Sequence, residues 1–151
     1  MSSETVRHEA AITLAGAMSL IGAAVSRAME LDRRVAVVVL DRFGRMVACQ
    51  CMDGCVNSAF DVALAKARHS ANFRRPTKFQ QDLLTNESAL PILGIPGMIP
   101  LEGGLEIHHD GETIGAVGVA GGSAFEDGAI GLAGITAAGF ASEHPGALPS
   151  R

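Results

Sequence analysis

The sequence predicts an α+β fold in which a single antiparallel sheet is flanked by helices, in the order α-β-β-α-α-β-β-α. Two hairpin signals, at residues 41–44 and 110–111, each lie between runs rich in apolar and β-branched residues. Segments of helical length precede, separate and follow these hairpins. No strand-helix-strand pattern is long enough to force a parallel sheet. The 151 residues suit one domain over residues 1–151.

The first helix is predicted over Glu4–Leu31, because apolar residues recur there at steps of three and four: Leu14, Met18, Ile21, Val25 and Ala28. Two strands follow, over Val35–Leu40 and Arg45–Cys51. Between them, Asp41 and Gly44 suit the first and last positions of a type I turn that ends in a residue with positive φ. These strands are therefore predicted to pair as an antiparallel hairpin.

The second helix is predicted to start at Ser58, which resembles the first residue of a capping box with Asp61 in place of the usual Glu. It should run to about Phe73, because Pro76 disfavours helix at the residue before it. A shorter helix is expected around Lys78–Leu84.

The remaining third of the chain contains a loop, a second hairpin and a last helix. Pro91–Gly104 holds three Pro and four Gly in fourteen residues, so a shaped loop is predicted. Leu105–His109 and Glu112–Ala120 flank an Asp-Gly turn and predict the second hairpin. Phe125–Phe140 is apolar and helix-like, with interior glycines that favour close packing against another helix or subunit. This stretch is the reason for expecting a homo-oligomer.

Charge and composition exclude several classes of protein. A net charge of -4 leaves no polycationic surface for nucleic acid, so no nucleic-acid partner is expected. Residues 1–11 lack a secretory pattern, and the uncharged stretch at residues 10–26 is too short and too interrupted to span a membrane. We therefore expect a cytoplasmic protein without membrane contact, in which the three cysteines are packed reduced thiols.

One face of the second helix carries a candidate site. Lys66 and His69 share an arc with Ser70 and Phe73, and a lysine and a histidine on one face can orient an acidic ligand and move a proton. The alternative is that both polar side chains are solvated and Phe73 alone is core. Basic residues that follow can cap the helix or grip a carboxylate: Arg74, Arg75 and Lys78.

Glu102 is the single charge within the Pro/Gly-rich loop. An acid held in a partly apolar loop tends to acquire a raised pKa, which suits a general acid or base, although a solvated rim position fits equally well. His108 and His109 point to opposite faces of a strand, so they do not share one metal in the simplest geometry. Cys49, Cys51 and Cys55 lack a second paired motif, so no zinc site and no disulfide is predicted.

Several dissimilar motifs, in this order, resemble the GlcG/HbpS family and together cover about residues 14–139: Asp41–Gly44, Arg45–Gly54, Asp61–Arg68, Phe73–Thr77, Pro96–Gly104, and Gly115–Val119 with Gly121-Gly122. The resemblance implies an antiparallel sheet flanked by helices, and assembly into dimers or larger oligomers. The family includes a haem-binding sensor component, the C-terminal domain of PduO-type corrinoid adenosyltransferases, glycolate-operon proteins, and an enzyme type that deaminates aminomuconates.

Departures from the family pattern add proton-transfer groups. His69 stands where the family usually has Thr, and Glu106 stands where it usually has Pro, close to the family-typical Lys66 and Glu102. These departures favour a metal-independent enzyme without a cofactor, which hydrolytically deaminates an aminomuconate-type enamine or a related small anionic acid. The predicted catalytic residues are Glu102, His69 and Lys66, and the predicted substrate-binding residues are Arg74, Arg75, Gly103 and Gly104.

The alternative is a haem- or corrinoid-binding protein in which a histidine such as His8 or His108 ligates the metal. In that case the apolar interface of an oligomer would accept the ring.

Overall fold

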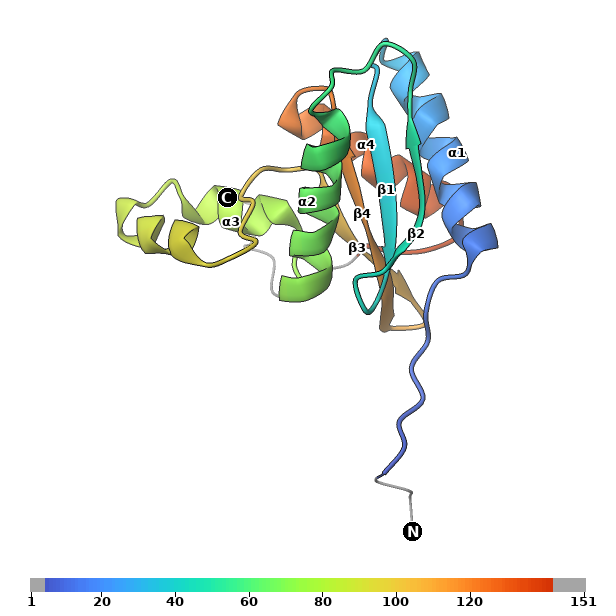
Figure 1. The fold of residues 1–151 in the computed structure, drawn as a ribbon, viewed down its shortest axis with the longest axis horizontal. Helices are drawn as coiled ribbons and strands as arrows, with labels where there is room; N and C mark the ends of the chain where they lie inside the picture. The colour runs from blue at the N-terminus through green and yellow to red at the C-terminus, as the bar shows by residue number, and fades with distance from the viewer. Residues whose placement is uncertain (1–4, 143–151) are drawn as a thin grey trace.

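The computed structural model describes residues 5–142. Its elements follow the predicted order, with one added 3₁₀ helix: α1 (Leu14–Glu30), β1 (Ala36–Asp41), β2 (Met46–Cys51), α2 (Ala59–Phe73), α3 (Thr77–Leu83), η1 (Glu87–Gly94), β3 (Gly104–His109), β4 (Glu112–Ala120) and α4 (Ala124–Ala137). The predicted α+β class, with one antiparallel sheet between helices, is confirmed (Figure 1). No helix within residues 5–142 is long and apolar enough to cross a membrane.

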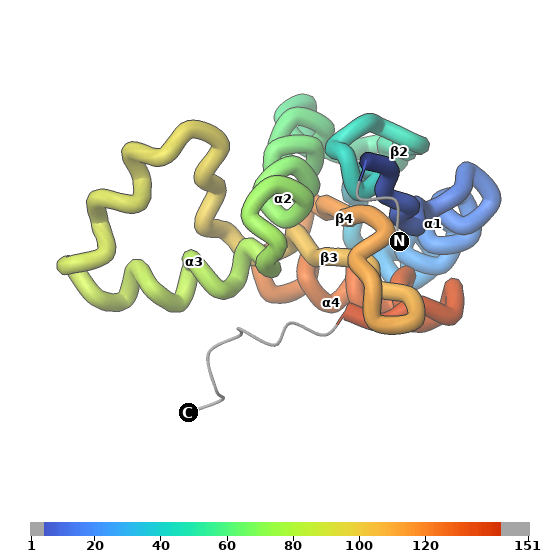
Figure 2. The backbone as a smooth tube through the Cα atoms, turned by 90° about the horizontal axis from the view of Figure 1, so that it is seen from below, coloured from blue at the N-terminus to red at the C-terminus, as the bar shows by residue number. Residues whose placement is uncertain are grey.

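The sheet has the order β2-β1-β4-β3, and every neighbouring pair is antiparallel. Helices α1 and α4 cover one face and α2 covers the other, as the view along the sheet shows (Figure 2). All six residues of β1 are buried because this central strand has helices on both sides. A β-branched run without polar alternation is typical of such a position.

Helix α2 approaches the sheet closely because only small side chains lie between them. Ala59, Ala63 and Ala67 face the sheet from the helix, and Gly118 faces them from β4. A Cβ atom added at Gly118 would overlap the carbonyl oxygen of Ala63. Glycine at this position therefore sets the distance between helix and sheet.

The glycines of α4 pack inside the chain. A Cβ atom at Gly134 would lie 2.7 Å from the carbonyl oxygen of Leu20 and 3.0 Å from the Cβ atom of Ala24, both on α1. Of the two partners expected for this stretch, a helix or a subunit, the structure supplies the helix.

One helix start and one predicted cap differ from the prediction. Helix α1 begins at Leu14 rather than Glu4, because the Thr13 hydroxyl accepts a hydrogen bond from the N–H of Gly16 and caps the helix there. Helix α2 does start at Ser58, which precedes Ala59 as its N-cap, but Ser58 has helical backbone angles (φ -76°, ψ -10°) and its side chain makes no capping hydrogen bond, so the predicted capping box is wrong. The true capping box joins Ser123 and Glu126 at the start of α4.

The Pro/Gly-rich segment is only partly a loop. Helix η1 extends to Gly94 and contains Pro91, so the predicted loop over Pro91–Gly104 reduces to residues 95–103. We call residues 77–103, which include α3 and η1, the arm, because they project away from the sheet beyond α2 (Figures 1 and 2).

Candidate functional site

The arm is tied back to α2 through His69, whose side chain is fully buried. Its Nδ1 atom accepts a hydrogen bond from the N–H of Ile99 at 2.9 Å, so the proton of the neutral ring sits on Nε2, which donates to Oε1 of Gln80 at 3.0 Å. Burial lowers the pKa of His69, and the Gln80 contact opposes that shift only in part. Both ring nitrogens are therefore engaged in hydrogen bonds within the chain.

Two further side chains of α3 hold the end of the same loop by its backbone. Oε1 of Gln81 accepts from the N–H of Glu102 at 2.7 Å, and Oγ1 of Thr77 accepts from the N–H of Gly104 at 2.9 Å. Thr77 is fully buried. These side chains position the loop by accepting hydrogen bonds from its backbone N–H groups. A buried backbone N–H group outside secondary structure needs such an acceptor.

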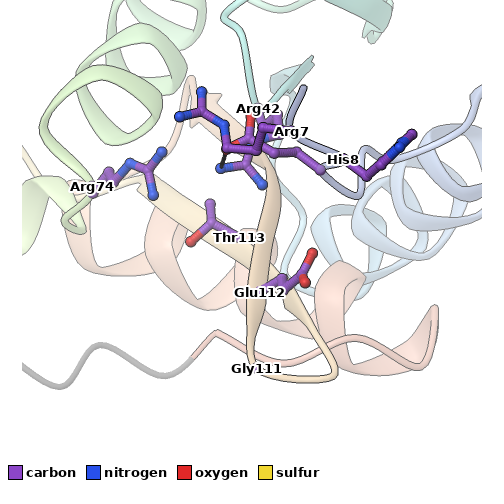
Figure 3. Close-up of a pocket in the computed structure, with 8 residues that line it drawn as sticks. Arg7, His8, Arg42, Arg74, Gly111, Glu112 and Thr113 are labelled. Atoms are coloured by element: carbon purple, nitrogen blue, oxygen red, sulfur yellow. Dashed lines mark ion pairs between the residues drawn. The ribbon is translucent and has the colours of Figure 1, made fainter. Parts of the chain in front are cut away.

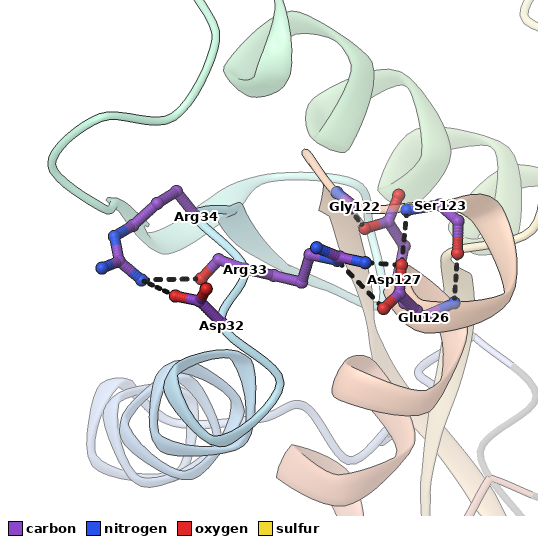
Figure 4. Close-up of polar contacts among 7 residues, drawn as sticks. All are labelled: Asp32, Arg33, Arg34, Gly122, Ser123, Glu126 and Asp127. Atoms are coloured by element: carbon purple, nitrogen blue, oxygen red, sulfur yellow. Dashed lines mark hydrogen bonds and ion pairs between the residues drawn. The ribbon is translucent and has the colours of Figure 1, made fainter.

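Lys66 lies at the base of this arrangement and is 1% exposed. Its Nζ atom donates to the carbonyl oxygen of Val119 at 2.9 Å and to Oδ2 of Asp127 at 3.0 Å. Oδ1 of Asp127 accepts from the N–H of Gly122 at 2.8 Å, a contact visible in Figure 4. Burial raises the pKa of Asp127, while the charge of Lys66 and these hydrogen bonds act in the opposite direction.

Glu102 lies close to this ion pair. Burial raises the pKa of its carboxyl group, which is the shift expected for an acid in a partly apolar loop, and the charges of Lys78 and Lys66 oppose it. A Cβ atom at Gly103 would lie 2.7 Å from Nζ of Lys66, and one at Gly128 would lie 2.6 Å from Oε2 of Glu102. The two glycines make room for the two charged groups.

A small cleft of about 200 Å³ opens beside the buried pair, lined by residues from α2, the loop and the start of α4: Val56, Ser58, Ala59, Val62, Lys66, Leu101, Ala120, Gly121, Gly122, Ala124 and Asp127. The predicted residues Lys66, Glu102, Gly103 and Gly104 lie close together, although only Lys66 of these four lines the cleft. Asp127, the partner of Lys66, was not among them. Asp127 lies at the start of a helix, and nothing in the sequence around it indicates that its carboxylate pairs with a lysine 61 residues away.

The two predicted arginines lie elsewhere. The guanidinium carbon of Arg75 lies 4.1 Å from the centre of the Phe79 ring, a cation-π contact at the start of the arm. Arg74 ends α2 in the left-handed conformation, with φ 52°. It lines a different cleft from the one beside Lys66.

That second cleft, which we call the cationic cleft, measures about 350 Å³ and is lined by Arg7, His8, Glu9, Arg42, Arg74, Gly111, Glu112 and Thr113. Figure 3 shows Arg74 at one end and His8 at the other, with Arg7 and Arg42 between them. Glu9 pairs with Arg7 at 2.8 Å and with Arg42 at 3.1 Å. Three arginines against two glutamates leave the lining cationic.

Sequence reasoning missed most of this cleft because it placed Arg7 and His8 inside the first helix. In the structure they belong to the extended segment before Thr13, where Ile12 donates its N–H to the carbonyl oxygen of Ile114 at 3.0 Å. That bond lays the segment along the end of the sheet.

The other two histidines of the described residues stand outside the cationic cleft. Nε2 of His108 lies 3.3 Å from Oε2 of Glu106, which also accepts from Oγ1 of Thr113 at 3.0 Å. The ring of His109 contacts Phe140 edge to face at 5.9 Å between centroids. Within residues 5–142, no group of three or more His, Cys, Asp or Glu residues is arranged to hold a metal ion.

Comparisons with known proteins find related chains, of which three are described here. Protein GlcG of Escherichia coli K12 is 34% identical over 103 residues, covering 68% of this chain and 76% of the relative. A double variant of HbpS from Streptomyces reticuli superposes with a TM-score of 0.81 at 28% identity, covering 90% of this chain and 92% of that one. A structure described as a complex of PduOC with haem has a TM-score of 0.81 at 25% identity, covering 89% and 99%.

These comparisons contradict the predicted aminomuconate deaminase. The small molecule named in the descriptions of the relatives is haem, and none of the relatives reported above is described as a deaminase or hydrolase. The prediction gave His69 a role in proton exchange. In the structure both ring nitrogens of that residue bind the arm.

The sequence model of a family described as haem degrading protein, HbpS-like, matches residues 12–136. The motifs that suggested this resemblance lie in the same range, and the antiparallel sheet with its flanking helices superposes on solved structures from these relatives. The chain belongs to the HbpS-like family.

Proposed function

We propose that this chain binds haem and that the cationic cleft receives the propionate-bearing edge of the ring. Two findings on relatives support the proposal: the family is described as haem degrading protein, HbpS-like, and PduOC has a structure in complex with haem. The observation that carries the proposal is that three arginines and one histidine line a single cleft of about 350 Å³.

The side chains of the cationic cleft fit the polar edge of haem. Arginine presents a planar fork that binds carboxylates in a bidentate manner, and haem carries two carboxylates on one edge. Arg42 is 8% exposed at its side chain and is held by Glu9 at 3.1 Å, so its guanidinium is already oriented. A corrinoid carries mainly amides around its ring, which makes haem the better match for these arginines.

Among the described histidines, His8 is the best candidate for an iron ligand. It is exposed and lines the cationic cleft, whereas both ring nitrogens of His69 are engaged and His108 faces Glu106. Neutral imidazole is a common axial ligand of haem iron.

Two arginines of the cationic cleft have exposed apolar neighbours in the sequence, which suit the faces of the ring. Val6 and Phe43 are 61% and 63% exposed and are the chain neighbours of Arg7 and Arg42. An exposed apolar residue next to a charged lining gives a flat, largely apolar ligand a surface to cover. When bound, haem would supply a redox-active iron centre, and the residues of this chain would bind and orient it.

The test is a titration of the full chain with haemin, in which binding is monitored by absorbance. The chain has neither Trp nor Tyr, so it is almost transparent near 280 nm and any bound chromophore stands out. We expect saturable binding with a shifted Soret band. His8→Ala should change the position of that band, and Arg74→Ala should weaken binding about tenfold, the effect of losing about 1.4 kcal/mol of charge-assisted hydrogen bonding.

Matched controls come from outside the cationic cleft. Arg27→Ala removes an exposed arginine of α1 that pairs with Glu30, and His109→Ala removes an exposed histidine. Both should bind haemin as the wild type does. Binding that does not saturate, or equal weakening by Arg74→Ala and Arg27→Ala, would overturn the assignment of the cleft.

A homo-oligomer and a cytoplasmic location stay predictions. Exposed apolar side chains on the outer surfaces of α1 and α4 support self-association: Leu14, Met18, Met29, Phe125 and Leu132. A monomeric mass by light scattering at micromolar concentration would contradict it.

A further inference from the structure

The three cysteines lie at one end of the edge strand β2. Cys49 and Cys51 are exposed on this strand, Cys55 follows it and is half-buried, and all three are free thiols. The expectation that they are packed is therefore wrong for the two strand residues. The covering helices leave β2 largely exposed, unlike β1 beside it.

A tight turn brings Cys55 back towards Cys51. The N–H of Cys55 donates to the carbonyl oxygen of Met52 at 3.1 Å, and Gly54 takes the positive φ of 82° that this reversal requires. The side chain of Cys55 packs against the apolar cluster that includes Ala36, and Ala36 is the residue opposite Cys51 in the strand pairing. Both cysteines therefore lie next to the same part of the core.

The turn over residues 52–55 and the shared neighbour Ala36 pair Cys55 with Cys51 rather than with Cys49. The pKa of Cys51 is raised first by burial, then by the charges of Cys55 and Cys49, and also by a side-chain hydrogen bond with Cys55. Cys49 and Cys51 are two positions apart on one strand, opposite Val38 and Ala36. Their Cα atoms are held apart by the extended backbone, at a spacing of about 6.5–7 Å that is unfavourable for a disulfide.

Although the cysteine spacing alone predicts no disulfide, we propose that Cys51 and Cys55 form a reversible thiol-disulfide pair that responds to peroxide. One thiolate attacks an oxygen atom of hydrogen peroxide, the O–O bond breaks, and a sulfenic acid forms while the departing hydroxide takes up a proton and becomes water. The second thiolate then attacks the sulfenic sulfur, the S–S bond forms, the S–O bond breaks, and the departing hydroxide takes up the proton that the second thiol released and becomes a second water. Two thiols are oxidised and one peroxide is reduced to two waters.

The crosslink would tie the end of β2 to the turn that leads into α2. Because the attacking species is the thiolate, the raised pKa of Cys51 predicts slow oxidation at neutral pH and faster oxidation in alkaline solution. The pair is separate from the cationic cleft, since neither cysteine lines it. Failure of haem binding would therefore leave this proposal standing.

The test exposes the full reduced chain to hydrogen peroxide and analyses it by intact mass and peptide mapping. The wild type should lose two hydrogen atoms in an intramolecular disulfide between Cys51 and Cys55, which dithiothreitol reverses. Cys49→Ser is the matched control and should form the same crosslink in the same yield. Cys51→Ser and Cys55→Ser should instead gain oxygen on the remaining thiols.

Three results would overturn the proposal: addition of oxygen to the wild type without a crosslink, disulfides between chains only, or a crosslink in Cys55→Ser at the wild-type yield. Circular dichroism of each variant confirms that it is folded. Replacing exposed Cys51 by Ser leaves the core intact, so this variant keeps the test decisive even if Cys55→Ser is unstable.

Discussion

The imidazole of His69 and the backbone N–H of Ile99 form a hydrogen bond of 2.9 Å that joins α2 to the C-terminal part of the arm. Thirty residues separate the two partners, so this one bond closes a long excursion of the chain. The other ring nitrogen is bound to Gln80. A side chain that was expected to move protons therefore holds the arm in place.

Replacing His69 by Ala should release the arm and lower the free energy of unfolding. The change leaves the N–H of Ile99 and the amide of Gln80 without their partner, which costs about 1–3 kcal/mol for each buried group. Denaturant unfolding measures the loss, and hydrogen exchange should accelerate at Ile99. His69→Asn, which places an acceptor near the position of Nδ1, should restore part of the protection, and equal exchange in both variants would contradict the proposed role.

The same histidine should make stability depend on pH below about 6.5. Burial lowers the pKa of His69 from 6.5 in the folded state, so between the folded and unfolded values the unfolded chain binds more protons. The contribution is complete above pH 6.5 and is lost as pH falls through this window. Glu102 and Asp127 have raised pKa values and act in the opposite sense at lower pH. The difference between wild type and His69→Asn isolates the histidine, and identical pH profiles would refute the assignment.

Lys66→Met should be strongly destabilising. It leaves the carboxylate of Asp127 buried without its ion pair, and breaking a buried pair from one side costs about 3–5 kcal/mol. Adding Asp127→Asn removes the unpaired charge while keeping an acceptor for the N–H of Gly122. The double variant should therefore be more stable than Lys66→Met alone in denaturant unfolding. Additive losses would show that the two residues are not coupled.

Gly118→Ala and Gly22→Ala should change stability in opposite directions. A Cβ atom at Gly118 overlaps the carbonyl oxygen of Ala63 and pushes α2 from the sheet, which costs about 1–3 kcal/mol or more. Gly22 lies on the exposed side of α1 with nothing within 4 Å, so alanine there should stabilise by about 0.5–1 kcal/mol. Thermal unfolding of the two variants gives the comparison, and a neutral Gly118→Ala would contradict the close packing.

Glu126 should titrate with a pKa of about 2 in the folded protein. Hydrogen bonds from Arg33 make the largest contribution to lowering the pKa of this carboxyl group from 4.5, and hydrogen bonds from the side chain and backbone of Ser123 lower it further (Figure 4). Arg33→Ala should raise the pKa towards 4.5, as followed by NMR of the carboxyl carbon. High salt should shift the wild-type value in the same direction, because the contact is on the surface. An unchanged pKa in Arg33→Ala would rule out this pair as the cause.

Local chemistry in the sequence was enough to predict the order of elements and the two hairpins. Gly44 takes φ 84° at the end of the first turn, and Asp110 and Gly111 take φ 49° and 77° in the second. Such turn signals depend on a few neighbouring residues, so the turn forms largely independently of the tertiary structure around it. Periodicity likewise placed α1, although it did not mark its true start, and Ser58 and Pro76 marked the two ends of α2.

The partners of the charged residues were decided by the tertiary structure alone. Lys66 and Asp127 are 61 residues apart, and the cationic cleft joins an N-terminal segment, two hairpin turns and the end of α2. Side-chain spacing along one helix says which residues share a face, but it does not say which distant backbone or carboxylate will cover that face. Whether His69 meets a substrate or the N–H of Ile99 therefore depends on the path of the arm, because a buried backbone donor must find an acceptor wherever the chain brings it.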